Sequence, residues 1–467
     1  MEESELVKKL AKGKIGVEEL DITFSQHELG ELNELIAKSQ ESLFNIKAKI
    51  KVKSKITKRF KEDLSEEERK SLKGRVKEIS ELIKADELTL KNTETVIAEY
   101  LTNNKKELKP LQFRNELNYK KIQGEVEFFV CDSFEDIRPQ WDAFLTRCPA
   151  HSSYHRSVWL NVLKDYSGFA IYLFGIKVDG EIVAAVPTLF MKSFLFGENQ
   201  ISVPYVNYGG VLSVSIEYSN ALFSGMKKWL LKNQVDYFEL RTTQSEYKLP
   251  MKDQKCSMIL SLPDSDESLE RGLSAKVRAQ YKKASNFRPI ITFGGVELLD
   301  EFYSIFSRNM RDLGTPVYSK SLFKKILEES EIESFLCVVK INGKPVSTAF
   351  LSGYRDMLEI PWASTLRSAN KFDSNMWMYR MILKEAIRRS YLYFDFGRTT
   401  IDSNTYKFKK QWGAKSVRHY WYYVLTNDSL PEANPDNPKY RLFISLWKML
   451  PVWVANRIGP HIVKNIP

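Results

Sequence analysis

The sequence predicts an α/β (α+β) protein in which one unit of helices and strands occurs twice, behind an N-terminal helical hairpin. Long apolar ladders with alternating steps of three and four residues run through residues 1–120, as in helices that pack along a seam. After Pro110, short strand-forming runs alternate with amphipathic helices, and the order of these elements repeats. The 467 residues, 43% of them hydrophobic, can bury two or three ordinary cores.

Two ladders predict the hairpin, which we expect to be an antiparallel coiled coil. The first consists of Leu29, Leu32, Ile36, Ser39, Leu43, Ile46, Ile50, Lys53, Thr57 and Phe60. The second consists of Leu72, Val76, Ile79, Ile83, Asp86, Leu90, Thr93, Ile97 and Tyr100. Ser65 and Glu68 have the spacing of a capping box that begins the second helix, so the break near residues 61–64 is the expected tip.

The first helix of the hairpin becomes basic toward this tip. Its cations follow one another with no acid between Glu41 and Glu62: Lys47, Lys49, Lys51, Lys53, Lys55, Lys58, Arg59 and Lys61. Such a run is commonly a solvated helix face. It is also the pattern of a surface that contacts phosphates, and tRNA is then the expected partner.

The elements of the first copy follow in order after residue 120. We expect a strand at 126–131, helices at 134–147 and 157–166, a hairpin at 170–191, a helix at 220–232 and a strand at 237–242. The turn of the hairpin falls at Asp179-Gly180, a dipeptide typical of tight turns. A further helix, basic on more than one side, is expected at 268–285 between the copies.

The second copy repeats this order. We expect helices at 298–313 and 320–329, a hairpin at 335–361 turning at Asn342-Gly343, a helix at 375–389 and a strand at 391–396. The predicted domains are therefore a hairpin at 1–120, a first α/β domain at 121–265, a second at 266–430, and an amphipathic tail at 431–467.

Composition limits the classes of function. The net charge of +11 and the pI near 9.1 favour an anionic partner, such as nucleic acid, a lipid headgroup or a phosphorylated substrate. The four cysteines are scattered, which predicts neither disulfides nor a zinc site. His151 and His155 have the spacing of helical metal ligands, but no third ligand lies near them, so no metal is expected. The start of the chain does not resemble a secretory signal, and a cytoplasmic location is expected.

The stretch YLYFDFGRTTIDSNTYKFKKQW, residues 391–412, is the expected centre of the chemistry. Its strand is expected to end at Gly397, which places Asp395 and Arg398 at a sheet edge, where ligands of open α/β sheets tend to bind. Lys407 follows among aromatic residues, a combination that suits an anionic ligand with a planar or apolar part. The alternative is a solvated turn with a surface ion pair.

The succession of two helices, a central hairpin, a helix and a strand looks like the acetyltransferase-type (GNAT) fold, present twice as tandem domains. WLNVLKDYSG, SVPYVNYGG, FYSIFSRNMRDLGTPVYS, LEIPWAST, SNMWMYRMILKEAI, FDFGRTT and YKFKKQWGA resemble, in order and spacing, FemAB-like transferases of the exosortase (XrtA)/PEP-CTERM-associated branch. The resemblance covers about residues 125–467 and implies transfer of an aminoacyl or acyl group to a cell-envelope polysaccharide or lipid-linked precursor.

The resemblance leaves the donor open between aminoacyl-tRNA and acyl-CoA, with no bound cofactor. Acetyltransferases hold the pyrophosphate of CoA on a glycine-rich loop, but residues 367–375, RSANKFDSN, contain no glycine, which disfavours CoA. A CoA-dependent N-acyltransferase remains the alternative enzyme, and a non-catalytic glycan-binding adaptor the alternative of another class. The sequence shows no Ser-His-Asp or Cys-His arrangement, so direct transfer is expected.

Transfer requires a base to remove a proton from the attacking group and cations to hold phosphate or oxyanion. The predicted catalytic residues are Asp395, Arg398, Asp312 and Lys407. The predicted substrate-binding residues are Arg311, Asn309, Thr315, Trp362, Arg367, Asn375, Tyr379 and Tyr208. Each has a structural alternative: Arg311 and Asp312 can simply end a helix, Trp362 can belong to the core, and Tyr208 can belong to a turn.

The tail carries apolar residues at near-helical spacing with only positive charge beside them. Pro451 must interrupt any helix there, so two short helices are expected. Trp447 and Trp453 beside cations suit the interface of an anionic membrane, which predicts peripheral contact with the inner membrane. The alternative is that both tryptophans are buried against the α/β core.

Overall fold

The computed structural model describes residues 26–60, 65–103, 124–148, 150–193, 197–245, 247–426, 430–431 and 438–466. The chain divides into two compact units, Met1–Leu111 and Gln112–Pro467. The first contains the helical hairpin and the second contains the α/β body.

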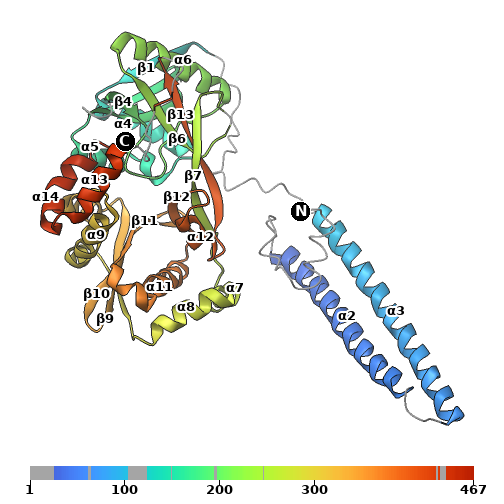
Figure 1. The fold of residues 1–467 in the computed structure, drawn as a ribbon. Helices are drawn as coiled ribbons and strands as arrows, with labels where there is room; N and C mark the ends of the chain where they lie inside the picture. The colour runs from blue at the N-terminus through green and yellow to red at the C-terminus, as the bar shows by residue number, and fades with distance from the viewer. Residues whose placement is uncertain are drawn as a thin grey trace. The chain divides into compact units, whose positions relative to one another are not determined.

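The hairpin consists of α2 (Gln26–Arg59) and α3 (Glu66–Asn103), which lie side by side and antiparallel (Figure 1). The capping box is confirmed, because Ser65 N donates to Glu68 Oε2 at 2.9 Å and Glu68 N donates to Ser65 Oγ at 3.3 Å. The expected tip at 61–64 lies outside the described residues. The prediction that Ile50 belongs to the seam is wrong, because its side chain is 50% exposed. After Ile46 the seam continues three residues later at Lys49, which pairs with Asp86 at 2.6 Å.

The second unit is organised around one sheet, with 13 strands in the described part of the chain. In spatial order its strands are β1 (Val126–Cys131), β2 (Ile171–Val178), β3 (Glu181–Ser193), β4 (Gly197–Ile201), β6 (Tyr237–Thr242), β13 (Lys415–Leu425), β7 (Met251–Ser261), β12 (Tyr393–Thr400), β11 (Met357–Thr365), β10 (Lys344–Tyr354), β9 (Glu333–Ile341) and β8 (Ile290–Gly294), with β5 (Leu212–Ser213) beside β3. Only two neighbouring pairs among these are parallel, β4 with β6 and β11 with β12.

Helices cover both faces of the sheet. The helices of this unit are α4 (Phe134–Arg147), η2 (Ser153–His155), α5 (Ser157–Ser167), α6 (Ile216–Asn233), α7 (Asp266–Gly272), α8 (Ala275–Ser285), η3 (Val296–Leu298), α9 (Leu299–Leu313), α10 (Lys320–Glu328), η4 (Arg367–Phe372), α11 (Ser374–Arg388), α12 (Asn404–Lys410), α13 (Pro438–Met449) and α14 (Val452–Val463). One apolar core joins α4, α5, α9 and α10 to the sheet. Two further cores lie on the other face of the sheet, one under α6 and one under α8 and α11. They contain the strand residues that alternate with those of the first core.

The two copies of the unit exchange their last strands. Strands β1–β4, helix α6 and strands β6 and β7 recur in order as β8–β11, α11, β12 and β13. However, β7 lies between β13 and β12, while β13 lies between β6 and β7 (Figure 1). Each copy therefore completes the hydrogen bonding of the other, and the sheet is continuous through both. The tandem arrangement expected from the sequence is confirmed, while the predicted domain boundaries stay predictions.

Most predicted elements form within a few residues of their expected bounds, and three differ. The region 335–361 is a three-stranded meander, because a second tight turn at Arg355-Asp356 starts β11, with Arg355 at φ 52°. The helix expected at 268–285 is two helices, since the Ser274 hydroxyl accepts from Val277 N and starts a new helix after Gly272. The strand expected to stop at Gly397 continues to Thr400.

The tail forms the two short helices that Pro451 predicts, and both contact α9. Trp447 is buried and Trp453 is 71% exposed, so the alternative in which both tryptophans are buried is wrong for Trp453, and contact of the tail with a membrane stays a prediction. Among the helices that the structure describes, none combines the length and the apolar character required to cross a bilayer.

Candidate active site

The centre of the sheet contains a fork between two parallel strands. Strands β11 and β12 pair over only three positions, Met357 with Tyr393, Leu358 with Phe394, and Glu359 with Asp395, and then separate. Ligands of α/β sheets bind where neighbouring strands part. The last paired position of this fork holds two carboxyl groups, one on each strand.

Glu359 is buried, and two neighbours from the first copy bind its carboxyl group. The Tyr154 hydroxyl donates to Oε2 at 2.7 Å, and the Asn207 amide donates to Oε1. Burial and, to a lesser extent, the adjacent charge of Asp395 raise the pKa of Glu359 to about 8, although the hydrogen bonds from Tyr154 and Asn207 oppose the shift. The group therefore holds its proton near neutral pH.

Asp395 has no exposed surface. The Tyr208 hydroxyl donates to Oδ2, and the backbone N–H of Gly397 donates to Oδ1 at 2.8 Å. Burial raises the pKa of Asp395, while the hydrogen bonds from Tyr208 and Gly397 and the charge of Lys409 oppose the shift. Gly397 lies in a β-bulge, with φ 75°, where the register between β12 and β7 shifts between Asp395 and Arg398. This glycine therefore bends the strand without ending it.

Lys409, on α12, places a buried cation beside the carboxyl pair. Its Nζ donates to the backbone oxygens of Gly397 at 2.7 Å and Arg398 at 3.1 Å. Burial lowers the pKa of Lys409 to about 8, although the charge of Asp395 opposes the shift. Two carboxyl groups with raised pKa values and an amine with a lowered pKa thus lie close enough to influence one another, an arrangement suited to proton transfer near neutral pH.

A chain of hydroxyls continues from Asp395 across the sheet. The Tyr208 hydroxyl lies 2.6 Å from Ser257 Oγ, which lies 3.0 Å from His419 Nε2. The sequence does not reveal this contact between Ser257 and His419, because β7 and β13 become neighbours only in the folded sheet. Ser257 is completely buried, and burial lowers the pKa of His419 to about 3. With no carboxylate bonded to His419 in the described chain, the pair is not an activated nucleophile.

Arg398 follows the bulge and lies beside the aromatic ring of Trp421. Its Cζ is 5.2 Å from the ring centroid, and its Nη1 is covered without a hydrogen-bond partner among the described residues. Burial lowers the pKa of Arg398 to about 10, and the nearby charge of Arg241 lowers it as well.

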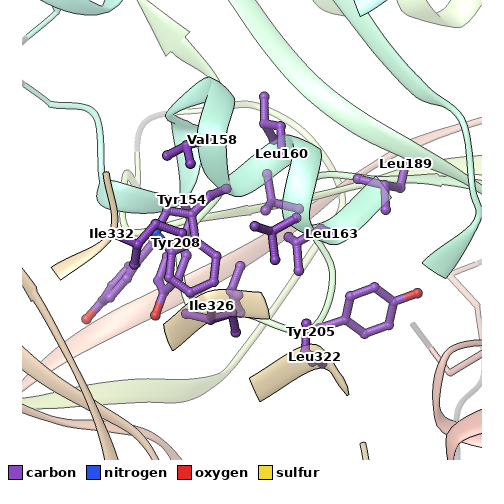
Figure 2. Close-up of a cluster of buried hydrophobic side chains, with 14 of the residues drawn as sticks. Tyr154, Val158, Leu160, Leu163, Leu189, Tyr205, Tyr208, Leu322, Ile326 and Ile332 are labelled. Carbon is purple, nitrogen blue, oxygen red and sulfur yellow. The ribbon is translucent and has the colours of Figure 1, made fainter. Parts of the chain in front are cut away.

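Figure 2 shows how the first copy reaches this site. Val158, Leu160 and Leu163 of α5 belong to the same buried cluster as Leu322 and Ile326 of α10. Tyr154 and Tyr208 emerge from the same cluster with their hydroxyl groups on one side, away from the aliphatic side chains (Figure 2). The apolar core between the copies therefore orients the two hydroxyls that reach Glu359 and Asp395.

The structure places Arg311, Asp312 and Arg367 at the end of α9. Arg311 Nε donates to Asp312 Oδ1 at 2.8 Å, and its Nη1 donates to the Leu450 carbonyl oxygen at 2.6 Å. Arg367 Nη2 donates to the Asp312 carbonyl oxygen at 2.6 Å. These contacts join α9 to η4 and the tail, and Gly314 ends the helix in the left-handed conformation.

The other predicted residues also lie apart from the carboxyl pair. The Asn309 amide donates to Ser364 Oγ at 3.0 Å, and the Thr365 hydroxyl donates to Asn375 Oδ1 at 3.3 Å. The remainder are Trp362 and Tyr379, which pack in apolar clusters, and Thr315 and Lys407, which are exposed. Of the predicted site residues, the structure brings together Asp395, Arg398 and Tyr208.

Sequence reasoning missed Glu359 and Lys409, although each leaves a signal. Glu359 is the only acid in the strand MLEIPWAST. Lys409 is buried on a seven-residue helix whose other lysines are exposed, a difference that its sequence does not reveal. Within the described ranges, no group of three His, Cys, Asp or Glu side chains is arranged to hold a metal ion.

The described residues line two cavities. One, of about 30 Å³, is lined by Tyr208, His155 and Arg241 among others, and has the size of a single water. The other, of about 360 Å³, lies between α5, α10 and α14. Its lining residues are Asp165, Tyr166, Ser319, Ser321, Leu322, Lys325, Pro460, His461 and Lys464. Only the larger cavity has the volume of a small-molecule site.

Comparisons with known proteins agree with this fold. Residues 272–410 match the family described as the acetyltransferase (GNAT) domain, so the chain carries a GNAT-type acyltransferase domain. GNAT acyltransferases use acyl-CoA as a substrate and need no metal. No curated protein matches the chain.

Several solved structures are similar at low identity. FemX has 15% identity and a TM-score of 0.45, covering 66% of this chain and 98% of its own. A tandem GNAT protein from the clavulanic acid biosynthesis pathway has 10% identity and a TM-score of 0.41, covering 66% and 100%. The C-terminal domain of a proposed lysylphosphatidylglycerol synthetase from Agrobacterium fabrum has 11% identity and a TM-score of 0.42, covering 63% and 93%.

The raised pKa of Glu359 predicts how stability depends on pH. The folded protein keeps this proton up to about pH 8, whereas an unfolded glutamate releases it near 4.5. The unfolded state therefore gains relative stability as pH rises through this window, by up to about 1.4 kcal/mol for each pH unit. Glu359→Gln should flatten this decline between pH 5 and 8, as measured by denaturant unfolding.

The matched control is Glu135→Gln, which changes an exposed glutamate on α4 and should leave the decline unchanged. An equally steep decline in the Glu359→Gln protein would show that another group causes it.

Proposed function

We propose that the protein is a FemAB-like acyl or aminoacyl transferase that modifies an amine or hydroxyl of a cell-envelope polysaccharide or lipid-linked precursor. The observation that carries this proposal is the carboxyl pair of Glu359 and Asp395 at the fork of the GNAT-type domain, with Lys409 beside it. The acceptor class comes from the family resemblance of the sequence motifs.

The three groups supply what acyl transfer requires. A carboxylate of the pair accepts the proton of the acceptor amine or hydroxyl as its nitrogen or oxygen bonds to the donor carbonyl carbon. The Lys409 ammonium stabilises the negative oxygen of the tetrahedral intermediate. When that intermediate collapses, the bond to the leaving ribose oxygen or thiol sulfur breaks, and the leaving group takes the proton that the carboxylate had accepted. No enzyme-bound acyl group is needed.

The segment after β4 controls access to the carboxyl pair. Its Val203 and Tyr205 have φ values of 44° and 73°, a conformation that is strained for residues with side chains, above all for a β-branched valine. Asn207 and Tyr208 of the same segment cover the carboxyl groups. We infer that this segment moves when substrate binds.

The larger cavity is the proposed entry for the acceptor. Tyr166, in its wall, contacts Tyr205 of the strained segment, with ring centroids 5.8 Å apart. The Tyr205 hydroxyl donates to the Lys464 carbonyl oxygen at 2.6 Å, which links the segment to the tail. Movement of the segment therefore opens a path from this cavity to the fork.

The start of α11 favours aminoacyl-tRNA over acyl-CoA as donor. Asp373 is the N-cap residue of this helix, but its side chain makes no capping hydrogen bond, and its carboxylate is paired with Lys283 at 2.8 Å. A carboxylate next to a helix N-terminus repels a pyrophosphate that would bind there.

The function is tested by offering each donor separately. Purified protein is incubated with labelled aminoacyl-tRNA or labelled acyl-CoA, together with a membrane extract, and the labelled product is measured. We expect label to move from aminoacyl-tRNA, and Glu359→Gln or Asp395→Asn to lower the rate by about 10²- to 10⁴-fold.

Lys409→Met should lower the rate comparably, whereas Lys410→Met, which changes an exposed lysine on the same helix, should not. Transfer from neither donor, or full activity in both carboxyl variants, would reject the proposed function.

The hairpin is the proposed contact for tRNA. Lys47, Lys51, Lys55 and Lys58 are exposed and recur at steps of four, four and three, so they form one basic stripe along α2. Lys49 is not part of the stripe, because it pairs with Asp86 on α3. A linear array of lysines suits the phosphate backbone of RNA.

Changing the four lysines of the stripe to glutamate should abolish tRNA binding, measured by filter binding or fluorescence anisotropy across salt concentrations. In the wild type, log Kd should rise with log salt with a slope of about three, because about four phosphates are neutralised. The matched control changes Lys70, Lys73, Lys77 and Lys84 of α3, which gives the same change in charge on the partner helix. Equal loss in both variants would mean that only net charge matters.

The tail is the proposed contact with the cytoplasmic face of the inner membrane. Among its described side chains, the exposed large apolar ones are Phe443, Leu446, Met449, Trp453, Ile458 and Ile466. Lys448, Arg457 and Lys464 are the charged residues among positions 443–466, and all are positive. An apolar surface with only cations beside it complements an anionic lipid surface.

The full chain should therefore float with vesicles of anionic phospholipid and not with vesicles of neutral phospholipid. Trp453→Ser with Met449→Ser should abolish flotation without unfolding the protein, since both side chains are exposed. Trp447→Ser, in contrast, should destabilise the tail, since its side chain is buried. Flotation that persists in the double variant would exclude this surface as the membrane contact.

A further inference from the structure

The two copies carry related strand motifs that differ by one inserted glycine. Strand β6 and its next residue read YFELRTT at 237–243, and β12 reads YFDFGRTT at 393–400. Glu239 and Asp395 hold equivalent positions, because each is the last residue of its strand to pair with the parallel neighbour at a fork. Arg241 and Arg398 are then equivalent, and Gly397 is the insertion.

In the first copy, the acid and the arginine neutralise each other. Arg241 Nε and Nη2 both lie 2.7 Å from Glu239 Oε1, and both side chains are buried. The Tyr423 hydroxyl donates to Glu239 Oε2 at 2.9 Å. Since residues i and i+2 of a strand point to the same face, the uninterrupted sequence E-L-R brings the two charges together. Arg241 therefore has little capacity left for a further anion.

In the second copy, the inserted glycine separates the two charges. Phe396 and Gly397 together oppose one residue of β7, so Asp395 pairs with Ile259 and Arg398 with Ser257. Asp395 accepts instead from Gly397 N and from the Tyr208 hydroxyl. Among the ion pairs of the described residues, none involves Arg398, and its Nη1 lies covered beside Trp421.

A second buried donor lies next to this guanidinium. The indole Nε1 of Trp421 is also covered and lacks an acceptor among the described residues. Arg241 lies over the same ring at 4.5 Å, so Trp421 contacts the guanidinium groups of both copies. Buried donors without acceptors cost free energy, and an anion that accepts from both would recover it.

We propose that Arg398 and the Trp421 indole bind an oxyanion of the substrate, a carboxylate or a phosphate, and that the Gly397 insertion creates this site in the second copy alone. The identification of the anion as part of the substrate rests on the proposed transferase function. The chain then has one oxyanion site of this kind, although it contains two copies of the fold, because in the first copy Glu239 already pairs with Arg241, the equivalent of Arg398.

The test uses inorganic phosphate and acetate as probes with the full-length protein. Binding is measured by isothermal titration at constant ionic strength, with chloride as the reference anion. We expect one site per chain, and tighter binding of one probe identifies the oxyanion as phosphate or carboxylate. Wild-type protein that binds neither probe would overturn the proposal.

Two variants locate the site. Trp421→Phe keeps the ring but removes the indole N–H, and should weaken binding about tenfold, the usual effect of a lost hydrogen bond to a charged group. Trp412→Phe makes the same chemical change in the core on the opposite face of the sheet and should leave binding unchanged. Equal binding in both variants and the wild type would overturn the proposal.

Deletion of Gly397 should abolish binding, because it restores the spacing that lets Asp395 neutralise Arg398. Conversely, Glu239→Gln should release Arg241 and raise the number of bound anions from one to two. The role of the glycine would be contradicted by two results together: the Glu239→Gln protein still binds one anion, and the folded deletion variant binds anions as the wild type does. These readouts do not require transfer, so normal anion binding with no transfer would reject only the proposed function.

Discussion

The burial of two carboxyl groups at one fork of the sheet is the constraint on which the rest of the structure depends. A buried acid without partners would be costly, and two adjacent acids would also repel each other. The cost is reduced by Tyr154 and Asn207 at Glu359, by Tyr208 and the Gly397 amide at Asp395, and by the nearby Lys409 ammonium. The same arrangement moves the pKa values of Glu359 and Lys409 to about 8, which makes them useful for proton transfer.

This constraint ties the two copies into one functional unit. The carboxyl groups belong to the second copy, but the hydroxyls and the amide that bind them belong to the first. The exchange of β7 and β13 keeps both copies in register across one sheet, and the aromatic and aliphatic core between α5 and α10 fixes the direction of Tyr154 and Tyr208 (Figure 2). A single copy would contain the acids without their partners.

Duplication also explains how one fold holds two different centres. The strands β6 and β12 place an acid and an arginine on the same face, next to Trp421 of β13. In the first copy, the regular alternation of the strand lets Glu239 and Arg241 form a salt bridge. In the second copy, a single bulge separates Asp395 from Arg398. One residue of backbone length thus separates a structural ion pair from a site with an unneutralised cation.

The sequence by itself determined the tandem α/β fold, the hairpin, the break of the tail at Pro451 and the choice of Asp395 and Arg398 as candidate residues, because these follow from local periodicity, turn residues and a motif. It missed Glu359, Lys409, Ser257 and His419, because their proximity depends on which strands become neighbours, and the strand exchange is not encoded in any local pattern. It also predicted that Gly397 ends its strand, since a glycine in a strand signals an end and a bulge alike. Only the pairing of β12 with β7 shows that Gly397 forms a bulge and does not end the strand, because the two strands are hydrogen-bonded on both sides of this glycine.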